Sequence, residues 1–165
     1  MFVEIFEYLI ENNCPIENSE ACSYAVVGNR FDVLKYLHIK GFRLGGFDWK
    51  KIVKNGNMEM LKYVRDNDAF PDIMALETAC AYAIKHNQFE ILKYLHDIGC
   101  DWNGRTFAEA IKSNQIEVVK YLHENGCTWT SLTSKCAATQ GNVEILTYLH
   151  DNNCPCTVPN CSYCS

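Results

Sequence analysis

The chain carries a pattern of hydrophobic and polar positions that recurs about every 27 residues. Its clearest part is a segment of eight residues with apolar residues at steps of three and a tyrosine at the sixth position. Successive tyrosines are 28, 27, 31, 27 and 27 residues apart, so one short insertion falls between Asp68 and Leu76. A regular period over nearly the whole length predicts a repeat solenoid. The copies are Val3–Ile10, Phe31–His38, Met58–Arg65, Phe89–His96, Ile116–His123 and Val143–His150.

Each copy predicts a helix with one apolar face. In the second copy, Phe31, Leu34 and Leu37 fall on one side of a helix, and Asp32 and Lys35 are spaced to pair on the outer side. A glycine or asparagine that follows soon after these helices favours a left-handed stop. These stop residues are Asn13, Gly41, Gly99, Gly126 and Asn153.

A shorter apolar pattern begins about nine residues before each of these helices. Its mostly small residues would let two helices approach closely, so the unit is a short helix, a tight turn, a second helix and a brief connector. The sequence therefore predicts an all-α fold. The two apolar columns are Ala25, Ile52, Ala83, Ala110 and Ala137, followed by Val26, Val53, Ile84, Ile111 and Ala138.

This unit resembles the ankyrin repeat. Ile98-Gly-Cys-Asp-Trp-Asn103 is similar to that family's Gly-Ala-Asp-Val-Asn connector, and Asn125-Gly-Cys127 matches the same place. The resemblance covers residues 1–156, as about five units plus an N-terminal half-unit, and leaves a cysteine-rich tail at 157–165. The period is about six residues shorter than the usual 33, and the family's Thr-Pro-Leu-His turn is absent. We therefore expect a helical ankyrin-like solenoid with shortened or absent β-hairpin fingers, of the kind found in giant viruses, oomycetes and protists.

Composition and charge exclude several classes of function. Fifteen Lys and Arg against twenty Asp and Glu give a net charge of −5, so no basic excess favours nucleic acid or an anionic membrane. No apolar run is long enough to span a membrane, and the N-terminus is a poor secretion signal. We expect a monomer in the cytoplasm or another intracellular compartment, in the host cell if the source is viral.

Catalytic signatures are missing from the sequence: there is no phosphate-binding glycine loop, nucleophile elbow or HExxH helix. The sequence thus predicts a non-enzymatic protein without a cofactor. Stacked helices lie 8–10 Å apart, too far for one ion to bind two histidines of the same column, so we expect these side chains to cap and pack. The column contains His38, His96, His123 and His150.

Ten cysteines occur, and eight of them follow the repeat, which predicts reduced thiols packed as small apolar residues. The C-terminal tail leaves three alternatives open: a zinc site, a Cys-x-x-Cys redox pair without the βαβ context of such pairs, or a frayed or capping end. The cysteines concerned are Cys154, Cys156, Cys161 and Cys164.

A repeat array binds through one extended concave surface, which the family resemblance assigns to the first helices and connectors. Two columns of these helices vary between repeats and form a basic ribbon edged with tyrosine, which would suit an acidic protein partner; a plain solvated face is the alternative. Trp102 and Trp129 are spacers between units or recognition aromatics. We predict a protein-interaction module, with a zinc-binding module or the substrate adaptor of a larger ubiquitin-ligase-type protein as alternatives. The candidate partner-binding residues are Tyr24, Lys50, Lys51, Lys54, Tyr82, Lys85, Glu109 and Lys112.

Overall fold

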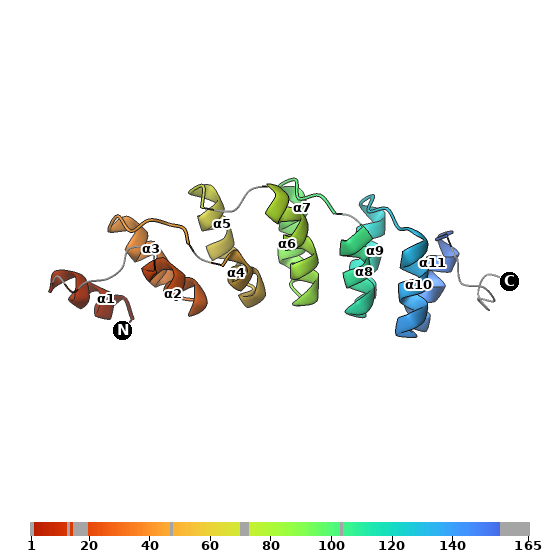
Figure 1. Ribbon diagram of the computed structural model, residues 1–165, viewed down its shortest axis with the longest axis horizontal. Helices are drawn as coiled ribbons and strands as arrows, with labels where there is room; N and C mark the ends of the chain where they lie inside the picture. The colour runs from red at the N-terminus through yellow and green to blue at the C-terminus, as the bar shows by residue number, and fades with distance from the viewer. Residues whose placement is uncertain are drawn as a thin grey trace. The chain divides into compact units, whose positions relative to one another are not determined.

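The protein is a succession of short helix pairs (Figure 1). The computed structural model describes residues 2–12, 14, 20–46, 48–69, 73–102 and 104–155, and these residues form eleven helices and no strand. The expected all-α repeat fold without β-hairpin fingers is thus confirmed for them. The chain divides into two compact units, residues 1–72 and 73–165, and each is described by itself.

Unit 1 contains a single helix followed by two helix pairs. The first helices of the two pairs, α2 and α4, pack against each other, and α1 packs on the second helix α3. Each first helix also packs on its own partner, so every helix has at least one apolar face covered. The helices are α1 (Phe2–Glu11), α2 (Ala21–Val27), α3 (Phe31–Ile39), α4 (Trp49–Asn55) and α5 (Met58–Asp66).

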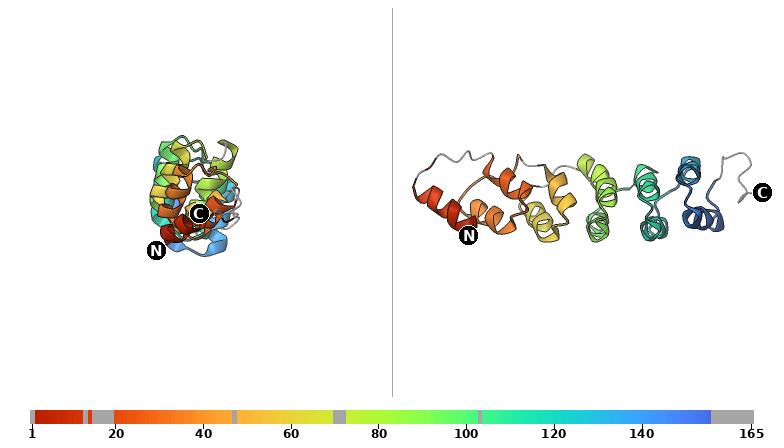
Figure 2. Two further views of the ribbon diagram at one scale, coloured as in Figure 1. Left: turned by 90° about the vertical axis from the view of Figure 1, so that its left-hand side faces the viewer. Right: turned by 90° about the horizontal axis from the view of Figure 1, so that it is seen from below.

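Unit 2 contains three helix pairs. Its first helices stack in the order α6, α8, α10, and the second helices α9 and α11 also pack on each other, so the pairs form two rows (Figure 2). The residue ranges of the six helices show a constant length for the second helices and a variable one for the first. They are α6 (Ile73–Lys85), α7 (Phe89–Asp97), α8 (Gly104–Lys112), α9 (Ile116–Glu124), α10 (Ser131–Gln140) and α11 (Val143–Asp151).

The insertion expected between Asp68 and Leu76 is taken up by a longer helix. α6 has 13 residues, whereas α8 has 9, and the difference equals the four residues by which the 31-residue spacing exceeds 27. Four residues are about one helical turn, so α6 gains a turn at its N-terminal end without disturbing the register of its packing face.

The predicted apolar columns form the core. Ala25, Ile52, Ala83, Ala110 and Ala137 are all buried, and so are the four residues that follow the first four of them. The fifth, Ala138, is exposed, and its assignment to the core was wrong. α10 is the last first helix of the described chain, so no described helix pair packs beyond it.

The turns and stops of the helices use left-handed backbone. Gly41, Gly99, Gly126 and Asn153 have φ between 59° and 90°, which confirms four predicted stops, while Asn13 lies outside the described residues. A second left-handed column, missed in the sequence, joins the two helices of each pair. Asparagine occupies that conformation more readily than other residues with a side chain, and glycine without strain. This column contains Asn29, Gly56, Asn87, Asn114 and Gly141.

Polar side chains link these turns from one repeat to the next. In unit 1, Asn57 Nδ2 donates to Asn29 Oδ1 at 2.7 Å. In unit 2, Asn142 Nδ2 donates to Asn114 Oδ1, while Gln115 Nε2 donates to the Ile84 carbonyl at 2.7 Å. These hydrogen bonds fix how far one pair can slide along the next, a constraint that apolar packing alone does not supply.

Candidate functional site

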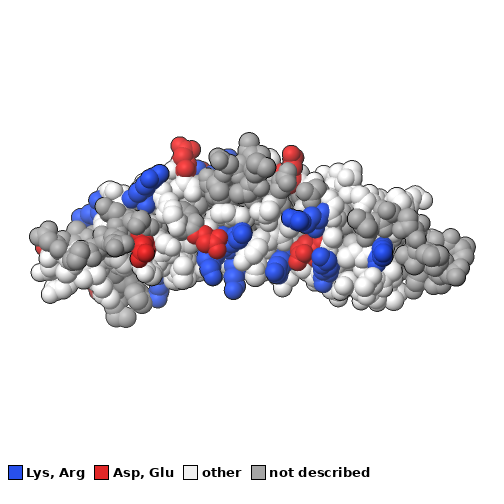
Figure 3. Space-filling view, in the orientation of Figure 1, with Lys and Arg blue, Asp and Glu red and all other residues white. Residues whose placement is uncertain are grey.

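The lysine column of the first helices is exposed in both units. Lys54 in unit 1 and Lys85 and Lys112 in unit 2 are exposed and lie in the last turn of their helices. A cation in the last turn also interacts favourably with the helix dipole, by about 0.3–1 kcal/mol, so part of this pattern serves helix stability. In the space-filling view, Lys and Arg atoms lie with Asp and Glu atoms among them on the face formed by α6 and α8 (Figure 3).

A shallow depression lies on this face of unit 2. Its volume is about 200 Å³, and it brings together three of the predicted residues, Tyr82, Lys85 and Glu109. Tyr82 and Glu109 are half-buried, not exposed, because the stacked helices α6 and α8 meet beside them. The Tyr82 ring is oriented on α6 by the His86 ring, with centroids 4.5 Å apart. The other lining residues are Thr78, Ala81 and Arg105.

Arg105 is the functional candidate that the sequence reasoning missed. It lies in the first turn of α8, exposed at the rim of the depression, and adds a second cation beside Lys85. The sequence does contain a pattern that could have identified Arg105. Thr78 and Arg105 lie four residues, about one helical turn, before Tyr82 and Glu109, and they belong to a third column that varies between repeats. Lys112 does not line the depression.

The candidates of unit 1 lie on two different helices. Lys50, Lys51 and Lys54 are all exposed on α4, whose N-terminus is capped by Asp48, with 3.1 Å between Lys50 N and Asp48 Oδ1. Tyr24 on α2 is 66% exposed, and its hydroxyl donates to Glu20 Oε2 at 3.2 Å. It therefore offers a large aromatic surface on the outside of α2.

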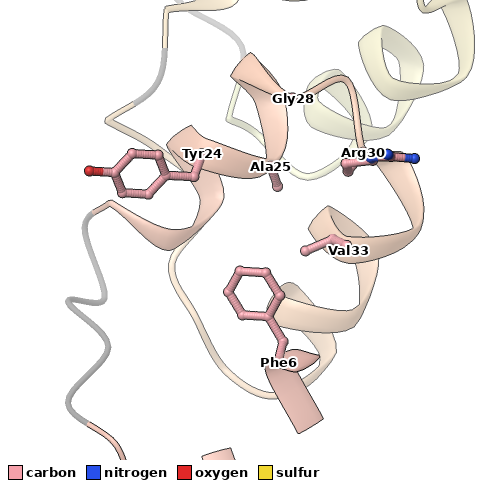
Figure 4. Close-up of a pocket in the computed structure, with 6 residues that line it drawn as sticks. All are labelled: Phe6, Tyr24, Ala25, Gly28, Arg30 and Val33. Atoms are coloured by element: carbon pink, nitrogen blue, oxygen red, sulfur yellow. The ribbon is translucent and has the colours of Figure 1, made fainter. Parts of the chain in front are cut away.

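Tyr24 also borders a largely apolar pocket of about 360 Å³ in unit 1. Phe6, Ala25 and Val33 point toward one another across the pocket, whereas the Tyr24 and Arg30 side chains extend away from it on opposite sides (Figure 4). Gly28 completes the lining. The pocket lies where α1, α2 and α3 converge.

Two histidines of the column form hydrogen bonds between repeats, which the sequence reasoning did not predict. His38 Nδ1 lies 2.7 Å from the Tyr63 hydroxyl oxygen, and His123 Nδ1 lies 2.9 Å from that of Tyr148. The repeated tyrosine of one copy is thus the hydrogen-bond partner of the preceding copy's histidine in these two places, a role that its spacing did not reveal.

Trp102 and Trp129 act as packing aromatics. Trp102 stacks on His96 with ring centroids 3.7 Å apart, and Trp129 stacks on His123 at 3.8 Å. Trp102 also makes an edge contact with Tyr121 of the next repeat. These contacts favour the spacer interpretation over recognition.

The cysteines that follow the repeat are mostly buried. Burial raises the pKa of the Cys127 thiol to about 11 and also raises that of Cys22, so these groups stay protonated near neutral pH. Cys154 is buried as well, whereas Cys156, Cys161 and Cys164 lie outside the described residues. Within the described ranges, no group of three or more His, Cys, Asp or Glu is placed to hold a metal ion. The zinc and redox alternatives for the tail therefore stay predictions.

Comparison with known proteins agrees with the repeat geometry. A family model described as ankyrin repeats (3 copies) matches residues 50–133, which is 84 of 165 residues. A search of curated proteins gives no match. In the described part of the chain, no helix combines the length and apolar character needed to cross a membrane. Ankyrin repeats generally mediate protein–protein interaction, are typically non-enzymatic and usually need no cofactor. The chain belongs to the ankyrin repeat family.

Proposed function

We propose that the protein binds an acidic segment of a partner protein on the exposed face of its first helices, with no covalent chemistry. The observation that carries the proposal is the depression of unit 2, where Lys85 and Arg105 flank an aromatic wall. The sequence predicted binding along a concave surface of the repeats, and the present proposal locates the specific contact on that surface.

The chemistry of the depression favours a carboxylate that is followed by an apolar or aromatic group. Lys85 and Arg105 supply two cations against one acidic group, Glu109, so the local charge is positive although the chain as a whole carries −5. An arginine can bind a carboxylate through two parallel hydrogen bonds, and the half-buried Tyr82 ring offers contact area at low cost in conformational entropy.

Unit 1 offers a second cationic surface on α4. Lys50, Lys51 and Lys54 present three charges within two helical turns. Because the charges are exposed, they would mainly accelerate association and make it sensitive to salt, rather than supply most of the affinity. We propose that α4 by itself binds acidic segments weakly and through charge alone, and that the depression of unit 2 by itself provides the specific contact.

The test uses two fluorescein-labelled peptides, one of glutamate residues separated by alanine and tyrosine and one with glutamine replacing every glutamate. Fluorescence anisotropy should show binding of the glutamate peptide and little binding of the glutamine peptide. The double variant Lys85→Glu/Arg105→Glu should weaken binding by about tenfold or more, a loss of ~1.4 kcal/mol. Lys51→Glu/Lys54→Glu should mainly reduce the association rate and its dependence on salt.

A matched control places the same charge change on the second helices. Lys93 and Lys120 lie on α7 and α9 and pair with Glu90 and Glu117 at 2.8 and 3.4 Å. The variant Lys93→Glu/Lys120→Glu changes net charge as much as Lys85→Glu/Arg105→Glu but leaves the first helices intact. Equal losses for the two variants would refute a site on the first helices, and equal binding of the two peptides would refute an acidic partner.

A further inference from the structure

Two cysteines of one repeat are brought together in the core of unit 2. Cys80 on α6 and Cys100 in the connector after α7 are 0% and 1% exposed, and their Sγ atoms lie 2.7 Å apart. This distance is only about 0.7 Å longer than a disulfide bond of ~2.05 Å. The repeat explains why each of these positions holds a small buried residue, but it does not explain why two cysteines are in contact.

Both thiols are held in place by ordered backbone. Cys80 lies inside α6 between the buried residues Ala79 and Ala83. Cys100 follows Gly99, whose φ of 89° makes the left-handed stop of α7, and the Cys100 amide donates to the Leu95 carbonyl at 2.9 Å. Since neither segment can move far without breaking helix or stop, the two sulfur atoms stay within reach of each other.

By sequence, only this repeat has cysteine at both aligned positions, the first-helix position of Cys80 and the connector position of Cys100. Other repeats place an aromatic residue or another small residue in at least one of the two positions, as in the pairs Phe107 with Cys127 and Ser134 with Cys154. Cys127 is also buried, at 3% exposed, and occupies the same connector position in its repeat as Cys100 does, but the first-helix position of that repeat holds Phe107. It therefore serves as an internal control: a buried cysteine whose own repeat has Phe107, and not a second cysteine, at the first-helix position.

We propose that Cys80 and Cys100 form an oxidative modification site at which a low-molecular-weight disulfide, such as oxidised glutathione, generates an intramolecular disulfide. One thiolate attacks a sulfur of oxidised glutathione, forming a mixed disulfide and releasing one glutathione. The second thiolate attacks the protein sulfur of that mixed disulfide and releases the other glutathione. Two protein thiols are oxidised, one oxidised glutathione is reduced, and both thiol protons end on glutathione.

Burial makes this site slow to react in the folded state. The hydrogen bond with Cys100 and burial both raise the pKa of the Cys80 thiol, so little of the attacking thiolate is present. Oxidised glutathione must also reach atoms that are closed to solvent. Reaction therefore requires local opening of the α6–α7 pair, and mild denaturant should accelerate it.

Peptide mapping of the full chain tests the proposal directly. The purified protein is incubated with oxidised glutathione at mildly alkaline pH and then alkylated, and trypsin is used under non-reducing conditions. Cys80 falls in the tryptic peptide 66–85 and Cys100 in the peptide 94–105, each with one cysteine. We expect these two peptides to be joined by a disulfide that dithiothreitol removes.

Three separate variants identify the cysteines that react, so the test does not depend on any single variant that fails to fold. Cys80→Ser and Cys100→Ser should each abolish the linked peptides, while Cys127→Ser should leave them unchanged, and circular dichroism reports whether each variant is helical. Recovery of both peptides fully alkylated, while tail cysteines become oxidised, would overturn the proposal. Linkage of Cys80 to Cys127 in place of Cys100 would overturn it as well.

Discussion

Leu122 is the position at which the structure most directly tests the repeat packing. It lies on α9, is 0% exposed, and belongs to a helix packed both on its partner α8 and on α11 of the next pair. Leu122→Ala removes three buried carbon atoms. At about 0.8 kcal/mol for each, the lost transfer free energy is ~2.4 kcal/mol.

A cavity adds to this cost. If about 50–80 Å³ remains empty after relaxation, the additional penalty is ~1–2 kcal/mol at about 24 cal/mol per Å³. We therefore expect Leu122→Ala to lower the free energy of unfolding of unit 2 by about 3–4 kcal/mol. This is a large share of the ~5–15 kcal/mol typical of a small protein.

Urea unfolding monitored by far-UV circular dichroism provides the measurement. Ile39→Ala is the matched control, because it also removes three carbon atoms but from a side chain that is 80% exposed, and it should change stability by less than about 0.5 kcal/mol. Since repeats couple to nearest neighbours, Leu122→Ala should also split the transition, whereas Leu149→Ala on α11 should loosen that helix first. A loss under about half a kcal/mol for Leu122→Ala would refute the assigned packing face.

Two further predictions concern the polar turn and the buried thiols. Asn142 caps α11, accepting from the Ile145 amide at 2.9 Å, and donates to Asn114, so Asn142→Ala should cost ~1–2 kcal/mol in urea unfolding. Asn142→Asp keeps the cap and should recover most of that stability; equal losses for both variants would contradict a capping role. The Cys127 thiol has a pKa of about 11 against an ordinary 9.0, so as pH rises through this window the unfolded chain loses the proton before the folded one. Stability should fall between pH 9 and pH 11 by on the order of 2 kcal/mol from this group, and Cys127→Ser should flatten that part of the profile; an unchanged profile would show that burial of the thiol is not its cause.

The sequence predicted which lysines of the candidate binding face are exposed, but not all of the residues that line its depression. The lysine columns were identified because they vary while neighbouring columns stay apolar, and Lys54, Lys85 and Lys112 are exposed as that reasoning requires. Arg105 was missed because its column, although it varies too, holds no other basic residue in the sequence. Tyr82 and Glu109 were expected to be exposed, yet both are half-buried where α6 stacks on α8.

The sequence by itself determined the helices, their apolar faces and the place of their stops. These features depend on residues three, four or 27 positions apart, and such regular spacings are visible in one dimension. The left-handed stops at Gly99 and Gly126 follow in the same way, because few other residues adopt that conformation.

Only the tertiary structure decided which side chains meet between helices. The hydrogen bond between His38 and Tyr63 joins residues 25 positions apart, and the contact between Cys80 and Cys100 joins residues 20 apart. Whether such residues touch depends on the distance and tilt at which one helix pair stacks on another, and these are set by the summed volume of all the side chains packed between them. No single spacing in the sequence encodes that sum.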